Sequence, residues 1–300
     1  MAKTWNRLGL WAGLIMPALL IFAPESRGSE KLIWLLRDLA PLTVFDGPKK
    51  GQGMIDQLMP VLIASMPNYQ HVILRVNKAR AIQMLKDQPL ACDPTLLWNA
   101  ARANSITYST PIIGLHSNVL AIRRENRPLL EPFVHDQTLD LLAMLKARTV
   151  KLGVIAQRSY GEWIDEQVSH GPQEQLFTHY GSDPLGSLLQ MQSAGRVQAV
   201  LGYWPEIQSK ASQVGLPKDA LIFYPVKGAP LYQLIFIGCS DTAQGREAIH
   251  AINTVLANLG DNALNSSTAQ WFAPGQAGEY PEPGPVVADP PTEHRKKKRK

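Results

Sequence analysis

Apolar residues along this chain follow two patterns that alternate. Short runs of consecutive apolar or β-branched residues are typical of buried strands, and segments whose apolar positions recur every three or four residues are typical of helices. The runs that we expect to be strands are 32–36, 71–76, 90–92, 149–157, 176–180 and 197–204. The segments that we expect to be helices are 53–66, 78–86, 159–168, 184–195, 244–260 and a short one that ends near Trp271 and Phe272.

This alternation predicts an α/β protein in which helices cover mainly parallel sheets. The pattern occurs in the first third of the chain and again after residue 148, which predicts two small lobes. The length of 300 residues, of which 45% are hydrophobic, is enough to bury one large core or two modest ones.

The N-terminal segment has the pattern of a secretory signal. Two basic residues precede the apolar run Leu8–Ala23, and the sequence SRG, which ends at Gly28, follows it. The run is shorter than the roughly 20 residues that span a bilayer. We therefore expect a signal peptide over residues 1–28 that is cleaved after Gly28, and a mature protein in the periplasm. An uncleaved membrane anchor is the alternative.

The positive charge of the chain is concentrated at its ends. The formal net charge is +5, but residues 1–28 carry +2 and the last six residues, RKKKRK, carry +6, which leaves −3 for the residues between them. A nucleic-acid surface needs Lys and Arg clustered on the folded body. We therefore expect no nucleic-acid partner.

The C-terminal 27 residues, 274–300, are rich in proline and then in basic residues, and they lack apolar periodicity. Such a sequence cannot pack a core, so we expect a solvated, disordered tail. Electrostatic attraction of this tail to an anionic envelope surface is the alternative.

The chain contains two cysteines, Cys92 and Cys239. In an oxidising compartment an isolated pair is expected to form a disulfide, and two buried free thiols are the alternative. No Cys or His spacing indicates a metal site, and P-loop, HExxH and GxSxG motifs are absent. The sequence GQG at 51–53 lacks the third glycine of a dinucleotide fingerprint and predicts a turn. No metal, cofactor or enzymatic activity is expected.

The segment Cys92–Pro111, CDPTLLWNAARANSITYSTP, resembles a segment of the family 3 periplasmic solute-binding proteins that reads strand, Ser/Thr-rich turn, TxxR and then Phe-Ser-x-Pro-Tyr. Arg102 falls at the family's arginine, and Tyr108 and Ser109 follow at the family's spacing. The resemblance implies that Arg102 grips the ligand's carboxylate from the first lobe, with Thr95 as a further binding residue. A planar guanidinium matches a carboxylate with two parallel hydrogen bonds. A surface arginine on a helix is the alternative.

The segment Leu152–Trp163, LGVIAQRSYGEW, resembles the family's second-lobe segment VGVxxGSxxE, in which a strand leads into a helix start that receives the carboxylate. Free backbone N–H groups and the helix dipole make such a helix start attractive to anions. Ser159 and Tyr160 are expected to face the cleft, and Arg158, in place of a small residue, is expected to add a cationic contact. A structural N-cap role for Ser159 is the alternative.

The sequence AGRVQAVLGYWPEI resembles the family strand xGxxDAxxxD, whose last acid binds the α-ammonium of amino-acid ligands. Tyr203 stands at the position of that acid, and Leu39 stands where amino-acid binders often have an aromatic ring. A buried ammonium without an acidic partner is unfavourable. A classical polar amino acid is therefore not expected as the ligand. Trp204 is expected either to line the pocket or to fill the core.

Four short motifs resemble a subgroup of secreted binding proteins that lacks the ammonium site and has no assigned ligand. They are Arg37-Asp38 with Pro41, GQG at 51–53, RSYG at 158–161 and GRE at 245–247. Asp38, which belongs to the first of these motifs, is also counted among the expected ligand-binding residues.

The resemblance covers roughly residues 31–272 and implies a two-lobe type II periplasmic binding fold with two crossovers between the lobes. The first lobe is expected to contain 29–115 and 231–273, and the second 116–230. The implied ligand site is the cleft between the lobes, and ligand contact with both lobes would favour closure.

The leading function is capture of a small carboxylate-bearing solute, amino-acid-like or an organic acid, by a monomer that serves an ABC importer. The first alternative is a sensory or adaptor protein that signals closure to a membrane sensor or envelope partner. The second alternative is a dehydratase-like enzyme, for which Asp38 and Asp93 are the candidate acids.

Overall fold

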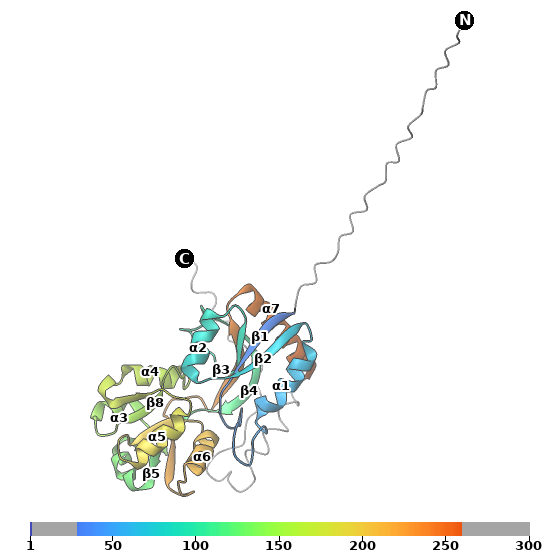
Figure 1. The fold of residues 1–300 in the computed structure, drawn as a ribbon. Coiled ribbons are helices and arrows are strands. Elements are labelled where there is room, and N and C mark those ends of the chain that lie inside the picture. The colour runs from blue at the N-terminus through green and yellow to red at the C-terminus, as the bar shows by residue number, and fades with distance from the viewer. Residues whose placement is uncertain (2–28, 260–300) are drawn as a thin grey trace, which may run out of the picture.

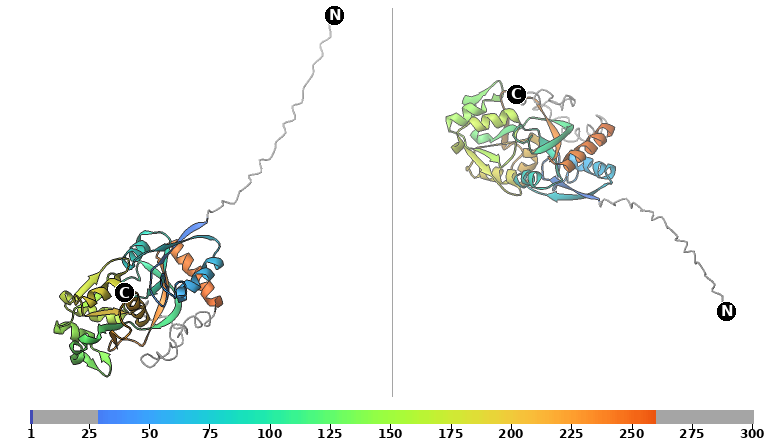
Figure 2. Two further views of the ribbon diagram at one scale, coloured as in Figure 1. Left: turned by 60° about the horizontal axis from the view of Figure 1, so that its bottom comes forward. Right: turned by 90° about the horizontal axis from the view of Figure 1, so that it is seen from above.

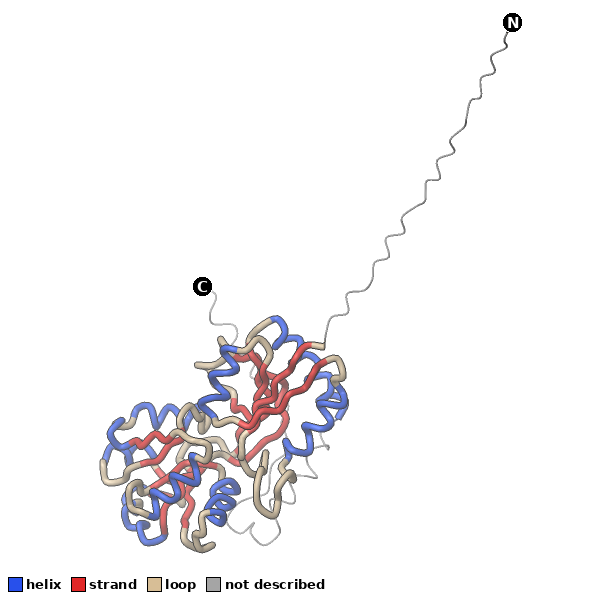
Figure 3. The backbone as a smooth tube through the Cα atoms, viewed as in Figure 1, coloured by secondary structure: helices blue, strands red, loops and turns tan. Residues whose placement is uncertain are grey.

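A computed structural model describes Met1 and residues 29–259 of the chain. The predicted signal peptide, the short helix near Trp271 and the tail over 274–300 lie outside the described residues. Within them the chain forms two α/β lobes, each built on a five-stranded sheet (Figure 1). Figure 3 shows the strands gathered in these two groups, with helices around them.

The sheet of the first lobe combines strands from both ends of the described chain. Its order is β2 (Tyr69–Arg75), β1 (Glu30–Leu36), β3 (Ala91–Leu97), β12 (Tyr232–Ser240) and β4 (Ile106–His116). Strand β1 runs parallel to β2 and β3, whereas β12 runs antiparallel to β3 and β4. The sheet is thus mixed, because the chain returns from the second lobe through β12.

Helices cover both faces of this sheet. Trp34 and Leu35 are consecutive residues of β1, and consecutive strand residues point to opposite faces. Trp34 packs in a core with α1 (Met54–Ser65) and α7 (Ala243–Leu259), and Leu35 packs in another core with α2 (Lys78–Asp87). The side chains of Trp34 and Leu35 are both fully buried.

The second lobe repeats this arrangement. Its strand order is β11 (Leu221–Pro225), β5 (Val119–Arg123), β10 (Ala199–Gly202), β8 (Leu152–Ile155) and β9 (Leu176–His179). One face packs against α3 (Leu141–Ala147) and α4 (Glu162–His170), and the other against α5 (Pro184–Ser193) and α6 (Trp204–Gln213). Short pieces complete the lobe, namely η1 (Arg124–Leu129), η2 (Glu131–Phe133), η3 (Gln173–Gln175), β6 (Val134–His135) and β7 (Thr138–Leu139).

The chain crosses between the lobes twice, from β4 to β5 and from β11 to β12. The two crossings are hydrogen-bonded to each other: the backbone N–H of Ser117 donates to the carbonyl of Leu231 at 3.0 Å, and Asn118 Nδ2 donates to Gln233 Oε1 at 3.0 Å. They form a two-stranded connection, which we call the hinge, and Figure 2 shows the fold from two further directions. The lobe boundaries expected from the sequence stay a prediction.

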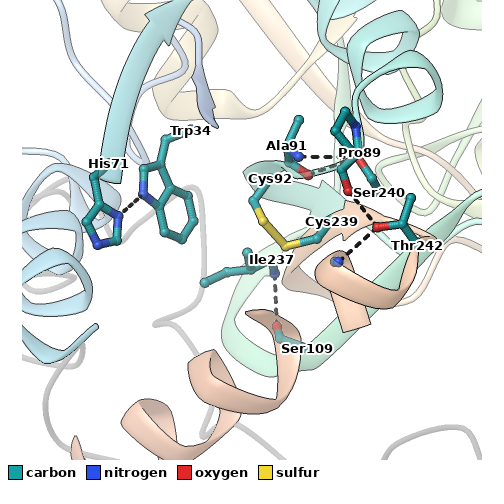
Figure 4. The surroundings of a disulfide bond; sticks show 11 residues. Trp34, His71, Pro89, Ala91, Cys92, Ser109, Ile237, Cys239, Ser240 and Thr242 are labelled. Atoms are coloured by element: carbon teal, nitrogen blue, oxygen red, sulfur yellow. Dashed lines mark hydrogen bonds between the residues drawn. A yellow bond between two sulfur atoms is a disulfide. The ribbon is translucent and has the colours of Figure 1, made fainter. Parts of the chain in front are cut away.

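The disulfide expected between Cys92 and Cys239 is present (Figure 4). The two residues are partners on the adjacent strands β3 and β12 and are fully buried. Beside the disulfide, the backbone N–H of Ala91 donates to Ser240 Oγ at 3.3 Å. The bond therefore joins the two sequence-distant segments of the first lobe.

Among the residues that the structure describes, none belongs to a helix that is both long and apolar enough to cross a membrane.

Candidate functional site

Two small cavities lie between the lobes, with volumes of about 20 and 40 Å³. A cavity of this size has room for one or a few water molecules, so the lobes are closed on each other. The expected binding residues that line one or both cavities are Asp38, Leu39, Thr95, Arg102, Arg158, Ser159 and Tyr203. The structure adds Arg37, Lys78, Asp183, Glu206 and Lys210 to the lining.

Arg102 contacts both lobes. It lies in the turn of residues 100–105 before β4, not on a helix, and it is half-buried. Its Nη2 donates to the carbonyl oxygen of Gln157 in the second lobe at 2.6 Å. Gln157 has a φ of 59°, the left-handed region that non-glycine residues seldom adopt. The guanidinium therefore bridges the cleft at the turn that begins the RSYG motif.

The start of helix α4, expected to receive a ligand carboxylate, is already bound by a carboxylate of the helix itself. Asp165 accepts hydrogen bonds from Ser159 Oγ at 2.5 Å and from the backbone N–H of Tyr160 at 2.7 Å. Asn99 of the first lobe donates to the same carboxylate at 3.4 Å. Burial raises the pKa of Asp165, and the bonds from Ser159 and Tyr160 partly oppose this. Ser159 also accepts from the backbone N–H of Gly161 at 3.3 Å, but the N-cap of α4 is Gly161 itself, so the N-cap role expected as the alternative for Ser159 is wrong.

Tyr160 was expected to face the cleft, and the structure places it elsewhere. Its side chain is buried in the core of the second lobe, and its hydroxyl accepts the backbone N–H of Ile155 at 2.7 Å. The ring packs against apolar core residues, and the hydroxyl provides a hydrogen-bond acceptor for the backbone N–H of the last residue of β8. Burial raises the pKa of Tyr160 to about 12. Tyr160 therefore supports the turn from inside the lobe.

The next residue, Gly161, connects this turn to the hinge. Gly161 has a φ of +103°, and a Cβ at this position would lie 1.9 Å from Nε2 of Gln233. That Nε2 donates to the carbonyl of Tyr160 at 2.6 Å. Only glycine allows the hinge strand β12 to approach so closely.

Arg158 was expected to add a cationic contact to the ligand, but its charge is neutralised within the second lobe. Its two terminal nitrogens donate to the two carboxylate oxygens of Glu206 at 2.8 and 2.7 Å, and the two side chains are 9% and 5% exposed. Burial lowers the pKa of Arg158, but Glu206 outweighs this effect and raises it above its ordinary value. Position 203 thus carries a tyrosine and no acid, but an acid stands three residues later, where Glu206 binds Arg158.

A second charged cluster lies on the first-lobe side of the cleft. Asp93 is fully buried, and its carboxylate lies 2.8 Å from Arg37 Nη1 and 3.4 Å from Lys78 Nζ. Thr95 donates to it from its backbone at 2.9 Å and from its hydroxyl at 2.6 Å. Burial would raise the pKa of Asp93, but Arg37, Lys78 and Thr95 together hold it well below its usual range. Two cations share one carboxylate, so this side of the cleft is electropositive.

Lys78 is a residue that the sequence interpretation missed. It is the first residue of α2, after the N-cap Asn77, and it is buried against the cavities. Burial lowers the pKa of Lys78 well below its ordinary value, and the charge of Arg37 adds to this. A cation at a helix N-terminus opposes the helix dipole. That unfavourable placement was the signal available in the sequence.

Asp38 and Lys210 connect the two lobes. Lys210 Nζ, on α6, lies 2.6 Å from Asp38 Oδ2 and 3.3 Å from Asp183 Oδ1. The other carboxylate oxygen of Asp38 accepts the backbone N–H of Phe45 at 2.9 Å. Asp38 therefore lines a cavity as expected, but its carboxylate is bound to a cation of the opposite lobe.

Trp204 takes the second of its two expected roles. Its ring packs edge-on against Phe223, with a centroid distance of 6.2 Å, in the core of the second lobe. Within residues 29–259 the structure contains no group of three His, Cys, Asp or Glu side chains that could hold a metal ion.

No protein-family model and no curated protein sequence matches this chain. Solved structures do match. An amino acid ABC transporter substrate-binding protein, AbpA from Streptococcus pneumoniae bound to L-arginine, is 13% identical, with a TM-score of 0.60 over 81% of this chain and 94% of that chain. A histidine kinase sensor domain with similarity to periplasmic binding proteins is 15% identical, with a TM-score of 0.63 over 82% and 97%.

A third match is an ancestral amino-acid-binding protein, AncCDT-1, a precursor of cyclohexadienyl dehydratase. It is 12% identical, with a TM-score of 0.59 over 82% of this chain and 96% of that chain. At these identities the likeness shows the fold alone. This chain has the two-lobe fold of the type II periplasmic binding proteins.

Proposed function

We propose that this chain is a periplasmic binding protein that holds a small carboxylate-bearing solute in the cleft between its lobes. The observation that carries the proposal is the position of Arg102, which reaches from the first lobe to Gln157 in the second and lines a cavity there. A guanidinium in this place contacts a carboxylate and the opposite lobe together. The solute then stabilises closure because it contacts both lobes.

The charged groups of the cleft favour an anion that carries no ammonium. Arg102 uses one nitrogen for Gln157 and has further N–H groups for a carboxylate. Lys78 Nζ lies 3.4 Å from Asp93, and Lys78 lines both cavities, so an anion bound there would lie close to it. Tyr203 replaces the acid that would receive an ammonium. An organic acid therefore suits the cleft better than an amino acid.

A thermal-shift screen of the mature protein tests this proposal, because a ligand that binds the native state raises its apparent stability. The screen contains mono- and dicarboxylates, amino acids and short peptides. We expect a shift with organic acids that Arg102→Ala removes. Arg246→Ala is the matched control, because Arg246 is an exposed arginine of the same lobe that pairs with Asp241. A shift that survives Arg102→Ala would reject the role of Arg102.

Delivery of the solute to an ABC importer is the cellular role that we infer for this binding activity. It is supported by the fold, which the chain shares with a transporter substrate-binding protein. Deletion of the gene is expected to abolish uptake of the solute that the screen identifies. Unchanged uptake would favour the second candidate.

The second candidate is a sensory or adaptor protein that reports the state of the cleft to a membrane or envelope partner. Two contacts favour it, since the chain's own groups hold the lobes together: Asn99 of the first lobe donates to Asp165 of the second, and Lys210 binds Asp38. A closed arrangement that the chain's own polar contacts stabilise suits a protein whose partner reads or reverses that closure. Small-angle scattering of the solute-free protein separates the two, because a transport protein opens in the absence of its solute and this adaptor stays compact.

An enzymatic role for the cleft has less support. Both candidate acids are bound in ion pairs, Asp93 to Arg37 and Lys78, and Asp38 to Lys210. The low pKa of Asp93 leaves it without a proton to donate at neutral pH. Stoichiometric binding without conversion of the solute is the expected result, and turnover would overturn it.

A further inference from the structure

A second hollow lies outside the cleft, on the hinge. It has a volume of about 490 Å³ and is larger than either cavity between the lobes. We call it the hinge groove and define it by six of its lining residues, Trp98, Glu162, Trp163, Glu166, Tyr232 and Phe236. Most of its lining is aromatic or apolar, and its two charged side chains are both acidic.

Trp163 forms a fixed aromatic surface in this groove. Its Nε1 donates to the carbonyl of Lys227 at 2.8 Å. Its ring packs on Gly228, where a Cβ would come within 2.7 to 2.9 Å of the indole and where φ is +82°. The side chain is nevertheless 42% exposed, and the nearby Leu231 is 56% exposed. A large apolar surface that is held in place and open to solvent is typical of a docking site.

Glu162 and Glu166 give the groove its charge. They lie four residues apart on α4 and are both exposed. Among the described residues neither has an ion-pair partner. Like charges at this spacing destabilise a helix, so an arriving cation would relieve their repulsion.

We propose that the Pro-rich and basic tail of this same chain, residues 274–300, docks in the hinge groove. The segment EYPEPGPVVADPPTEHRKKKRK combines the two features that the groove complements. Proline-rich segments adopt the extended polyproline helix and pack against aromatic grooves. The final RKKKRK supplies cations for the two glutamates.

The chain between the last described helix and the tail is long enough for this contact. Helix α7 ends at Leu259, and the pair Pro290-Pro291 follows about 30 residues later. An extended segment of that length reaches roughly 100 Å, whereas a small domain is about 30 Å across. The tail can therefore reach the groove of its own molecule.

Docking would contact both lobes at a place separate from the cleft. Trp98 follows β3 of the first lobe, and Glu162 and Glu166 belong to α4 of the second. The bound tail would therefore contact both sides of the hinge. This surface and its occupant are independent of the proposed solute site.

Zero-length carbodiimide cross-linking of the mature full-length protein tests the proposal, because it joins only carboxylates and amines that are in contact. We expect Glu162 and Glu166 to be linked to lysines of the tail, with a yield at least fivefold above that of Glu125 and Glu247. These two control glutamates are exposed on other elements. We expect Trp163→Ala to lower the yield at least threefold and Trp163→Phe to restore most of it, with unchanged far-UV circular dichroism in both variants.

Four outcomes would overturn the proposal. The first is equal yields at the groove and at the control glutamates. The second is a yield that Trp163→Ala does not change, which would mean that charge attraction alone draws the tail. The third is linkage only between isotopically mixed copies, which would assign the groove to a second molecule. The fourth is a tail that binds anionic phosphatidylglycerol vesicles and shows no linkage to the groove in their absence.

Discussion

Lys210 of the second lobe places its ammonium 2.6 Å from the carboxylate of Asp38 in the first, across the cleft between the lobes. The side chains of Lys210 and Asp38 are only 11% and 17% exposed, so water screens their attraction weakly. The two residues are 172 positions apart in the chain. Lys210 with Asp38 and Arg102 with Gln157 form contacts between the lobes in the closed arrangement.

Lys210→Met is expected to loosen this closure. The variant leaves Asp38 buried without its cation, and breaking a largely buried pair costs on the order of 2 to 4 kcal/mol. The expected results are a larger radius of gyration in small-angle scattering and a lower free energy of unfolding in urea. Lys86→Met, which removes an exposed lysine of α2, is the control and should change neither. An unchanged radius of gyration would show that the other interlobe contacts suffice.

Closure should be insensitive to pH near neutrality and should fail in alkali. Burial lowers the pKa of Lys210, but Asp38 and Asp183 outweigh this effect and raise it above its ordinary value of 10.5. The stabilisation from a group with a raised pKa is complete below the unfolded value and is lost as the pH rises through the folded value. The radius of gyration is therefore expected to stay constant from about pH 6 to 9. Above about pH 10.5 the radius of gyration of the wild type should increase. The Lys210→Met variant should lack that lysine-dependent transition.

Asp165→Ala should convert the start of α4 into a binding site for small carboxylates. The carboxylate of Asp165 binds Ser159 Oγ and the backbone N–H of Tyr160, and its removal leaves those donors without an acceptor. We expect a loss of about 1 to 3 kcal/mol of stability. Acetate or formate should partly restore the thermal stability of the variant and leave the wild type unchanged. Glu166→Ala, which removes a neighbouring carboxylate on the same helix, is the control for a general salt effect, and an equal response from it would reject the idea.

The double variant Cys92→Ala/Cys239→Ala should fold less stably. The disulfide closes a sequence separation of 147 residues, and the loss of a native disulfide typically costs about 2 to 5 kcal/mol. Urea denaturation with and without reductant measures this effect. Reductant should destabilise the wild type toward the level of the variant and leave the variant unaffected. A wild type indifferent to reductant under denaturing conditions would mean that the bond does not form.

Much of the fold could be predicted, and the failures have local causes. The strand expected over 90–92 continues to Leu97 as β3, because Asp93 and Thr95 interrupt the apolar pattern while lying buried in a polar network. Helix α6 was not predicted, because its first residue, Trp204, continues the apolar run of β10 and was counted with that strand. The sheets were expected to be mainly parallel, since periodicity indicates strands but carries no information about the direction of the returning strands β12 and β5.

The sequence by itself predicted the two lobes and the cysteine pair, and it singled out Arg102, although as a partner of a ligand carboxylate and not of the opposite lobe. These features follow from local periodicity, from composition and from motif spacing. Only the tertiary structure decided which charge neutralises which: Arg158 is bound to Glu206, Asp38 to Lys210, and the helix start at Ser159 to Asp165. The strength of an ion pair depends on distance, geometry and burial, and for partners tens or hundreds of residues apart these are set by how the two lobes fold and close.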